Sequence, residues 1–174
     1  MEKNFTFKIK FCLIYFKILI KDIKNIKKYA FYGSKLKSLR IPATLTSFES
    51  GAFAGCRYLA EIFVADGNPT YKQGNNTVIE IATDKVVVGC ANSIIDETVK
   101  IIGAHAFEDC DIKSISLPKG LLVIEQYAFA NNSKLSYVSL PKTLTSVESY
   151  SFLNCHANIA VPNKISSALA ENWR

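Results

Sequence analysis

The two histidines and five cysteines are the side chains of this chain best suited to catalysis or metal binding. His105 is followed closely by Glu108, Asp109 and Cys110, a set that could be drawn as a metal site. His156 has no matching partner of this kind. The sequence contains no zinc spacing, no Gly-rich phosphate loop and no nucleophile elbow. Any enzymatic chemistry would therefore depend on one cluster.

The position of His105 argues against that chemistry. It lies two residues before a phenylalanine, at a position that recurs along the chain and is otherwise mostly tyrosine. A position that is mostly tyrosine is typical of packing or surface exposure. Glu108 and Asp109 lie beside a turn, and a solvated loop accounts for two acidic residues there. We therefore expect no enzyme, no catalytic residue, no cofactor and no metal. The matching positions elsewhere hold Tyr29, Gly51, Tyr127 and Tyr150.

Three of the cysteines share a second recurring position, three residues after a phenylalanine: Cys56, Cys110 and Cys155. The same position holds Asn132 in one segment and Ser34 in another, a range of residue types that a metal site or disulfide would not tolerate. The odd cysteine count and the absence of a CxxC pair also argue against a closed disulfide set. We expect these thiols to be buried, unpaired members of the core.

These recurring positions belong to a repeat of about 23 residues. Between residues 112 and 155 the pattern occurs twice, since Pro118 and Phe129 recur as Pro141 and Phe152, each 23 residues later (141 − 118, 152 − 129). Self-similarity at such a period predicts a solenoid, in which stacked units bury each other's apolar faces. In the regular units a Leu-x-x-Leu-x-Leu strand ends at proline, a position held by Asp96 in one repeat, and an Ala-Phe or Ser-Phe pair fills the coil. The predicted core rings are Phe31, Phe53, Phe107, Phe129 and Phe152.

The repeats divide the chain into three parts. Strict alternation of apolar residues predicts a capping strand within residues 1–18, followed by a solenoid of about five repeats over 19–162. Residues 163–174 place Ile165, Leu169 and Trp173 at i, i+4 and i+8, which predicts a short helical cap.

One unit of the solenoid is enlarged by an insertion at residues 66–93. From Phe53 to Phe107 is 54 residues (107 − 53), so about 30 have been added to one repeat. Residues 66–69 have turn chemistry, 71–77 are polar and Asn-rich, and 78–88 predict a β-hairpin. Insertions in solenoids often line the binding face. The alternative is that the hairpin merely widens the sheet.

The net charge of +6 is localised. Residues 1–40 hold 11 Lys/Arg and two acids (+9), whereas the remainder holds 10 Lys/Arg and 13 acids (−3). Long-range attraction to anions therefore belongs to the N-terminal part, and we expect no nucleic-acid binding along the repeats. The apolar run 11–20 is broken by Lys17, lacks a cleavage site and is too short to span a membrane. We expect no transmembrane segment, and a divergent secretion signal is the alternative to a capping strand.

The full repeat, Leu-x-x-Leu-x-Leu-Pro-x-x-Leu-x-x-Ile-x-x-x-Ala-Phe-x-x-Cys, resembles that of the BspA-like leucine-rich-repeat family over about residues 19–162. The segments Asn68-Pro-x-Tyr71 and Val88-Gly89-Cys90 resemble a recurring insertion of that family. The resemblance implies a right-handed leucine-rich-repeat solenoid, mostly β with short turns or helical segments. It also implies a cell-surface or secreted protein that binds a host, extracellular-matrix or other partner macromolecule and catalyses nothing.

Two functions remain open. In the first, the outward side of the Leu-x-x-Leu-x-Leu strands is a protein-binding or adhesion surface. Its expected anchors are Arg40, Phe63 and Tyr137, because Tyr and Arg are enriched among residues that dominate binding energy. In the second, the chain is a structural spacer, or a fragment of a longer repeat array, without a ligand of its own.

Overall fold

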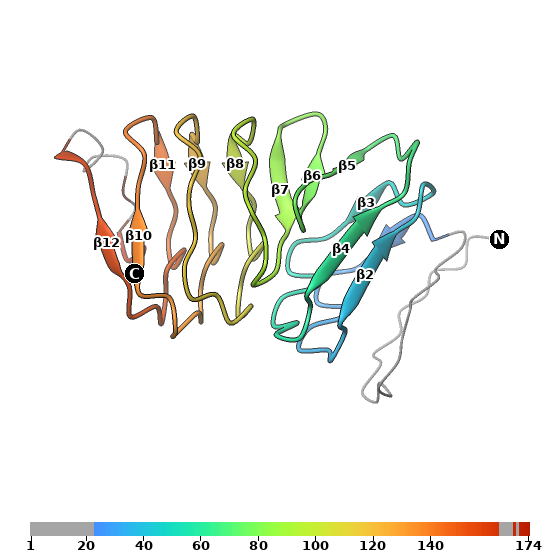
Figure 1. The fold of residues 1–174 in the computed structure, drawn as a ribbon, viewed down its shortest axis with the longest axis horizontal. Helices are drawn as coiled ribbons and strands as arrows, with labels where there is room; N and C mark the ends of the chain where they lie inside the picture. The colour runs from blue at the N-terminus through green and yellow to red at the C-terminus, as the bar shows by residue number, and fades with distance from the viewer. Residues whose placement is uncertain (1–22, 164–168, 170) are drawn as a thin grey trace.

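Twelve short strands joined by turns make up the secondary structure of the computed structural model, which describes residues 23–163, 169 and 171–174. The predicted capping strand within 1–18, and Cys12 with it, lies outside the described residues. Successive coils follow one another along the long axis of the molecule (Figure 1). The strands are β1 (Asn25–Ile26), β2 (Ser38–Ile41), β3 (Ser47–Phe48), β4 (Glu61–Val64), β5 (Tyr71–Gln73), β6 (Val78–Glu80), β7 (Lys85–Val88), β8 (Ile101–Ile102), β9 (Val123–Ile124), β10 (Tyr137–Ser139), β11 (Ser146–Val147) and β12 (Asn158–Ala160).

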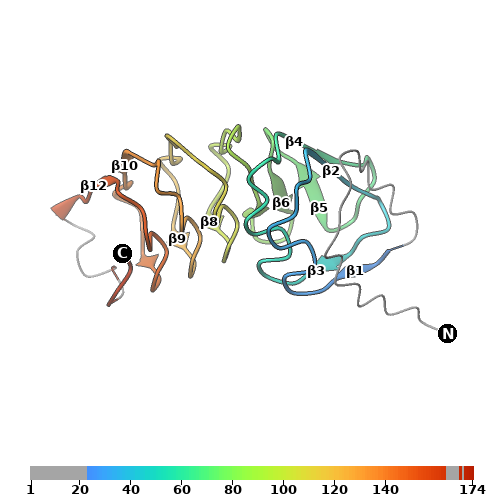
Figure 2. The ribbon, with the colours of Figure 1, turned by 90° about the horizontal axis from the view of Figure 1, so that it is seen from below.

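The regular coils contribute strands to two sides of the array. One side, here called the front face, carries the parallel pairs β2–β4 and β10–β12. The opposite side, the back face, carries the pair β1–β3 and a six-stranded sheet in the order β11-β9-β8-β7-β6-β5. Figure 2 shows β2 and β4 on one side and β1 and β3 on the other. The structure is therefore a β-solenoid with almost no helix among its described residues, while its right-handed winding stays a prediction.

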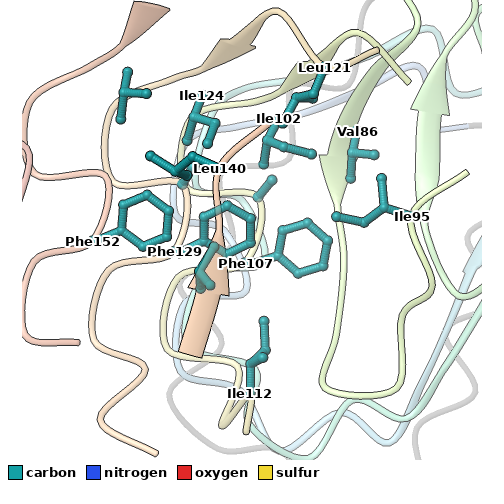
Figure 3. Packing of buried hydrophobic residues seen from close by; sticks show 14 of the residues in the cluster. Val86, Ile95, Ile102, Phe107, Ile112, Leu121, Ile124, Phe129, Leu140 and Phe152 are labelled. Carbon is teal, nitrogen blue, oxygen red and sulfur yellow. The ribbon is translucent and has the colours of Figure 1, made fainter. Parts of the chain in front are cut away.

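Buried side chains from the two faces meet between the strands. Alternation along β2 buries Leu39 and Ile41 and leaves Arg40 exposed, which is the period-two pattern of a half-buried strand. The phenylalanine rings of successive coils stack inside, with centroids 5.2 Å apart for both Phe107–Phe129 and Phe129–Phe152. Figure 3 shows these three rings in line beneath the branched side chains of the back-face strands.

The predicted core ring Phe31 differs from the others. It stacks on Phe53 at 5.1 Å but is only half-buried, whereas Phe53 is 5% exposed and Phe107, Phe129 and Phe152 are fully buried. The reason is its place in the stack. Phe31 belongs to the first described coil, and among the described residues the Phe53 ring covers one face of the Phe31 ring.

The stack of rings is interrupted at the insertion. The buried residues form two clusters, one from Ile26 to Cys90 and one from Ile79 to Ile159. Where they meet, the backbone of Gly89 lies directly against the Phe107 ring, and Gly89 N–H donates to the carbonyl of Ala106 at 2.8 Å. A Cβ at position 89 would overlap that ring, so glycine is required by close packing.

The insertion is a three-stranded meander. The predicted hairpin is present as antiparallel β6 and β7, and β7 pairs in parallel with the regular strand β8. The polar stretch 71–77, which the sequence did not predict to be a strand, contains β5, antiparallel to β6. The meander therefore adds strands to the back-face sheet, and does not form a free loop.

The expected front-face strand near residues 112–117 is not formed. Ser136 N–H donates to the carbonyl of Lys113, but the six-residue stretch is not assigned to a strand. The coil before it is the insertion, which offers no equivalent strand to pair with. The front face consequently consists of two separate two-stranded sheets.

The segment after β12 continues the coil pattern in its described residues. Leu169 bridges Val147 in parallel, Asn172 accepts from Tyr150 N–H, and Trp173 packs its ring edge-on against Phe152 at 5.7 Å. Residues 164–168 and 170, which make up half of the predicted helical cap, lie outside the described residues. The described part of the cap thus covers the ring stack in solenoid register.

The packing at Gly89 gives a stability prediction. Replacing Gly89 with Ala should lower the free energy of unfolding by about 1–3 kcal/mol, because the buried Phe107 ring cannot move aside without losing its own packing. The matched control is Gly120→Ala, whose Cβ would meet only the end of the flexible, exposed Lys100 side chain. Urea unfolding followed by circular dichroism measures both. Equal stability of the two variants would contradict the close contact.

Candidate functional site

The His105 cluster is built into a turn. His105 Nδ1 lies 2.6 Å from Glu108 Oε2, and each of these side chains is only 10% exposed. The other carboxylate oxygen of Glu108 accepts from Asn131 Nδ2 at 3.1 Å, and Asn131 Oδ1 accepts from Asn154 Nδ2 at 2.8 Å. This polar chain links three successive coils. With both of its oxygens engaged, the Glu108 carboxylate fixes the turn and has no free atom directed at a substrate.

The other two members of the cluster have separate roles. Asp109 accepts from Arg57 Nε at 2.8 Å, which joins it to the coil before the insertion. Cys110 is 3% exposed, and burial raises the pKa of its thiol well above the ordinary value, which keeps it protonated and unreactive. In the part of the chain that the structure describes, no three His, Cys, Asp or Glu side chains are grouped to hold a metal. The geometry indicates structural roles for all four residues.

The recurring position of His105 is a left-handed turn position. All five residues there have φ between 57° and 74°. The His105 ring lies edge-on to Tyr29 at 5.7 Å and stacked on Tyr127 at 5.1 Å, and Tyr127 stacks on Tyr150 at 5.2 Å. Gly51 leaves the space that the Tyr29 ring occupies. The aromatic contacts along this edge help to offset the cost of a left-handed backbone in non-glycine residues.

The recurring cysteine position is a hydrogen-bond donor position. Cys56 Sγ donates to the carbonyl of Phe31 at 3.2 Å, and Cys155 Sγ donates to that of Phe129 at 3.1 Å. Cys110 Sγ donates to the carbonyl of Gly89, at 3.7 Å. All are free thiols in the structure. Cys56 and Cys110 are buried, but Cys155 is half-buried, because only the segment from β12 to Trp173 covers that end of the described stack.

The Asn132 side chain is also a hydrogen-bond donor at this recurring position, and it has more partners than the cysteines. Its Nδ2 donates to the carbonyls of Phe107 and Phe129, at 2.8 and 2.7 Å, and its Oδ1 accepts from the backbone N–H groups of Cys110 and Ile112. The side chain is almost fully buried. Cys, Asn and Ser can share the position because each carries a donor.

Two of the three predicted anchors are brought together on the front face. Arg40 on β2 lies directly across from Phe63 on β4, and its Cζ is 4.9 Å from the centre of the Phe63 ring. Phe63 is 40% exposed, so packing in the core does not explain an aromatic ring at this position. A guanidinium held over an aromatic ring is a fixed pair of the type that anchors protein interfaces.

The third anchor lies elsewhere. Tyr137 is 53% exposed on β10, which pairs with β12 in a different sheet. The three expected anchors therefore do not lie together, because the insertion and the unpaired stretch 112–117 separate the two front-face sheets. Figure 1 shows β2 and β4 well apart from β10.

The insertion uses its polar side chains internally. Gln73 accepts from Val64 N–H and donates to the carbonyl of Ile62, and Asn76 accepts from Ile62 N–H. These two side chains occupy the edge of β4 that a following strand would otherwise pair with. Sequence reasoning missed this role, and the signal available for it was the pair of amide side chains in a segment rich in turn residues.

Asn68 provides a similar cap one coil earlier. Its Nδ2 donates to the carbonyls of Pro42 and Leu45, and its Oδ1 accepts from the N–H groups of Thr70 and Tyr71. Asn68, which belongs to a segment that resembled a family motif, thus joins the insertion to the preceding repeat.

Fold and repeat together define a leucine-rich-repeat solenoid. A family model described as a BspA type leucine-rich repeat region matches in six copies over residues 3–81 and 87–170. The chain belongs to this family, which confirms the resemblance drawn from the repeat. The family model counts six copies, where about five repeats are expected from the sequence.

One solved structure agrees with this assignment, and a second has related sequence. A leucine-rich repeat protein from Eubacterium ventriosum is 26% identical with a TM-score of 0.70, over 83% of this chain and 43% of its own. This chain thus spans less than half the length of that protein. A leucine-rich repeat protein from Bacteroides ovatus is 29% identical, with a TM-score of 0.48 over 77% of this chain and 33% of its own. A search of curated proteins gave no match. Among the described residues, no helix has the length and apolar character needed to cross a membrane.

The thiols give a reactivity prediction. In the native protein, Cys56, Cys90 and Cys110 should react slowly with a maleimide, because burial protects them and raises their pKa values, and Cys155 should react faster. All four should react quickly in denaturant. Mass spectrometry of the labelled peptides assigns each rate. Native labelling of Cys110 as fast as Cys155 would contradict the buried position.

Asn132 gives a second stability prediction. Asn132→Ala should lower the free energy of unfolding by at least about 2 kcal/mol, because it leaves several buried backbone groups without partners, at about 1–3 kcal/mol for each such group. Asn132→Cys should cost less, since the thiol retains a donor. Urea unfolding measures both against Ser133→Ala, an exposed neighbour. A loss as small as that of Ser133→Ala would show that these hydrogen bonds do not stabilise the fold.

Proposed function

We propose that this chain is a non-enzymatic binding module of a cell-surface or secreted protein. It binds a protein or other macromolecule, such as a host or extracellular-matrix protein, through its front face. The observation that carries the proposal is the exposed Arg40–Phe63 pair, which is fixed across two paired strands. The alternative, a spacer without a ligand, offers no reason for an exposed ring at this position.

The shape of the surface supports a large partner. A stack of coils presents a long, shallow side, which suits a macromolecule better than a small substrate that needs burial on several sides. The Glu108 carboxylate that contacts His105 and the cysteine thiols are engaged in hydrogen bonds between coils, which favours binding over catalysis. The cell-surface or secreted setting rests on the family resemblance.

In this proposal the insertion contributes less to the binding surface than its sequence predicted. Its amide side chains bond to the neighbouring coils, so the residues that remain for a partner lie mainly on β2 and β4. Strands β5 to β7 extend the back-face sheet, which agrees with the alternative interpretation that the insertion widens the sheet.

Alanine substitution tests the proposed surface. Arg40→Ala with Phe63→Ala should weaken binding to a matrix or host-cell protein by at least about tenfold, or roughly 1.4 kcal/mol, and leave the melting temperature nearly unchanged. Pull-down from extracts, followed by titration of the recovered partner, measures this. Tyr137→Ala, an exposed aromatic residue of the other front-face sheet, shows whether the surface extends that far. Equal binding by the double variant and the natural chain would favour the spacer.

A further inference from the structure

The first described coil is the basic part of the array. Residues 23–41 contain six Lys/Arg and no Asp/Glu, and all six basic residues are exposed. Residues 42–174 contain 10 Lys/Arg and 13 Asp/Glu, so the positive charge does not continue along the repeats. The charge lies at the end of the molecule that carries β1 and β2 (Figure 1).

Half of these charges flank or lie on β2. Lys35, Lys37 and Arg40 fall within six residues, so at most about 18 Å of chain separates the first from the last. Leu36 and Leu39 between them are buried and hold the row against the core. These three exposed cations, Lys35 and Lys37 just before β2 and Arg40 on it, are here called the basic row.

The basic row is largely without counter-charges. Among the described residues, none of its three members forms an ion pair, whereas Lys27 on the same coil pairs with Glu49 at 3.0 Å. The acid on the paired strand is Glu61, which lies across from Ser38. One carboxylate beside three cations leaves a net positive surface.

Apolar side chains adjoin the basic row. Phe63 lies across from Arg40 and is 40% exposed, and Tyr58, just before β4, is 60% exposed. A partner made only of anionic groups could use the cations but would leave these rings in water. A partner that carries acidic and apolar side chains together could use both.

We propose that the partner of the β2–β4 surface contributes an acidic polypeptide segment that also carries apolar side chains. Its carboxylates lie along Lys35, Lys37 and Arg40, and an apolar side chain packs against Phe63. Charge attraction speeds the encounter, and burial of the ring slows dissociation. This inference rests on the proposed function and specifies the chemistry of the partner.

Synthetic peptides test the inference without the natural partner. The probe is a fluorescein-labelled peptide of four Glu-Glu-Leu triplets, and the controls replace every Glu with Gln or every Leu with Ser. The acidic, leucine-bearing peptide should bind at least about tenfold more tightly than either control, and its affinity should fall as salt is raised. Fluorescence anisotropy gives the dissociation constants.

Charge reversal in the protein locates the site. Lys35→Glu, Lys37→Glu and Arg40→Glu together should weaken the probe by at least about tenfold. The control reverses three exposed lysines of the later coils, Lys113, Lys119 and Lys142, and so changes the net charge equally. That control should alter affinity by less than about twofold, because screening limits attraction over such separations. Phe63→Ala should weaken the leucine peptide but not the serine peptide.

Three results would overturn the inference. The first is equal loss in both charge-reversed proteins, which would indicate attraction to net charge alone. The second is heparin, a sulfated polysaccharide without apolar groups, binding as tightly as the leucine peptide. The third is no binding of any acidic peptide while a natural partner is still captured and still lost on Arg40→Ala with Phe63→Ala. In that third case the proposed function stands and only the acidic partner is excluded.

Discussion

Hydrogen bonding between the backbones of successive coils is the constraint on which the rest of this structure depends. Most strands are only two to four residues long, so the ladder within strands satisfies few groups. The turns continue it, since Phe107 N–H donates to the carbonyl of Ala128 and Phe129 N–H to that of Ser151, each at 2.8 Å. Because buried backbone groups must be paired, every departure from the repeat needs a substitute partner.

Side chains supply those substitutes in a regular way. At one recurring position a carboxylate accepts a backbone N–H of the preceding coil, as Glu125 does from Ala104 and Glu148 from Gln126. At another, Cys or Asn donates to a backbone carbonyl. At the insertion, where the regular strand is missing, Gln73 takes over the edge of β4. Residues that look unrelated in the sequence therefore share one role: Gln73, Asn132 and the recurring carboxylates bond backbone groups that face a neighbouring coil.

The repeat period and the apolar positions were enough to predict the solenoid, the ring stack and the β6–β7 hairpin, because burial imposes a period that one sequence displays several times. The predictions that failed concerned strands, whose formation depends on which segments lie beside them in the folded chain. The stretch 112–117 has the strand pattern but no partner strand, and β5 has a polar sequence but a partner in β6. Tyr137 occupies the same kind of position as Phe63, yet the insertion places them in different sheets.

The candidate site was harder to predict than the fold for a related reason. Gly51, at a position otherwise held by Tyr and His, was a sign of a left-handed backbone, since glycine adopts positive φ without strain. The donor role of the cysteine position could have been inferred from its mixture of Cys, Asn and Ser. The repeat period, by contrast, does align Arg40 with Phe63, which follows 23 residues later (63 − 40), and the structure pairs the two across β2 and β4.

The residues that hold the coils together differ from those that face outward, and this difference bears directly on function. The residues with catalytic potential, His105, Glu108 and Cys110, are held by bonds between coils, and changing them would disturb the stack. The outward residues of β2 and β4 contribute little to the stack, since the buried side chains of those strands hold the coils together. Substitutions there can alter what the surface binds at small cost in stability. In the described coils the buried polar side chains thus serve mainly the assembly of the solenoid, whereas the charge and exposed ring of β2 and β4 stay free for the proposed recognition.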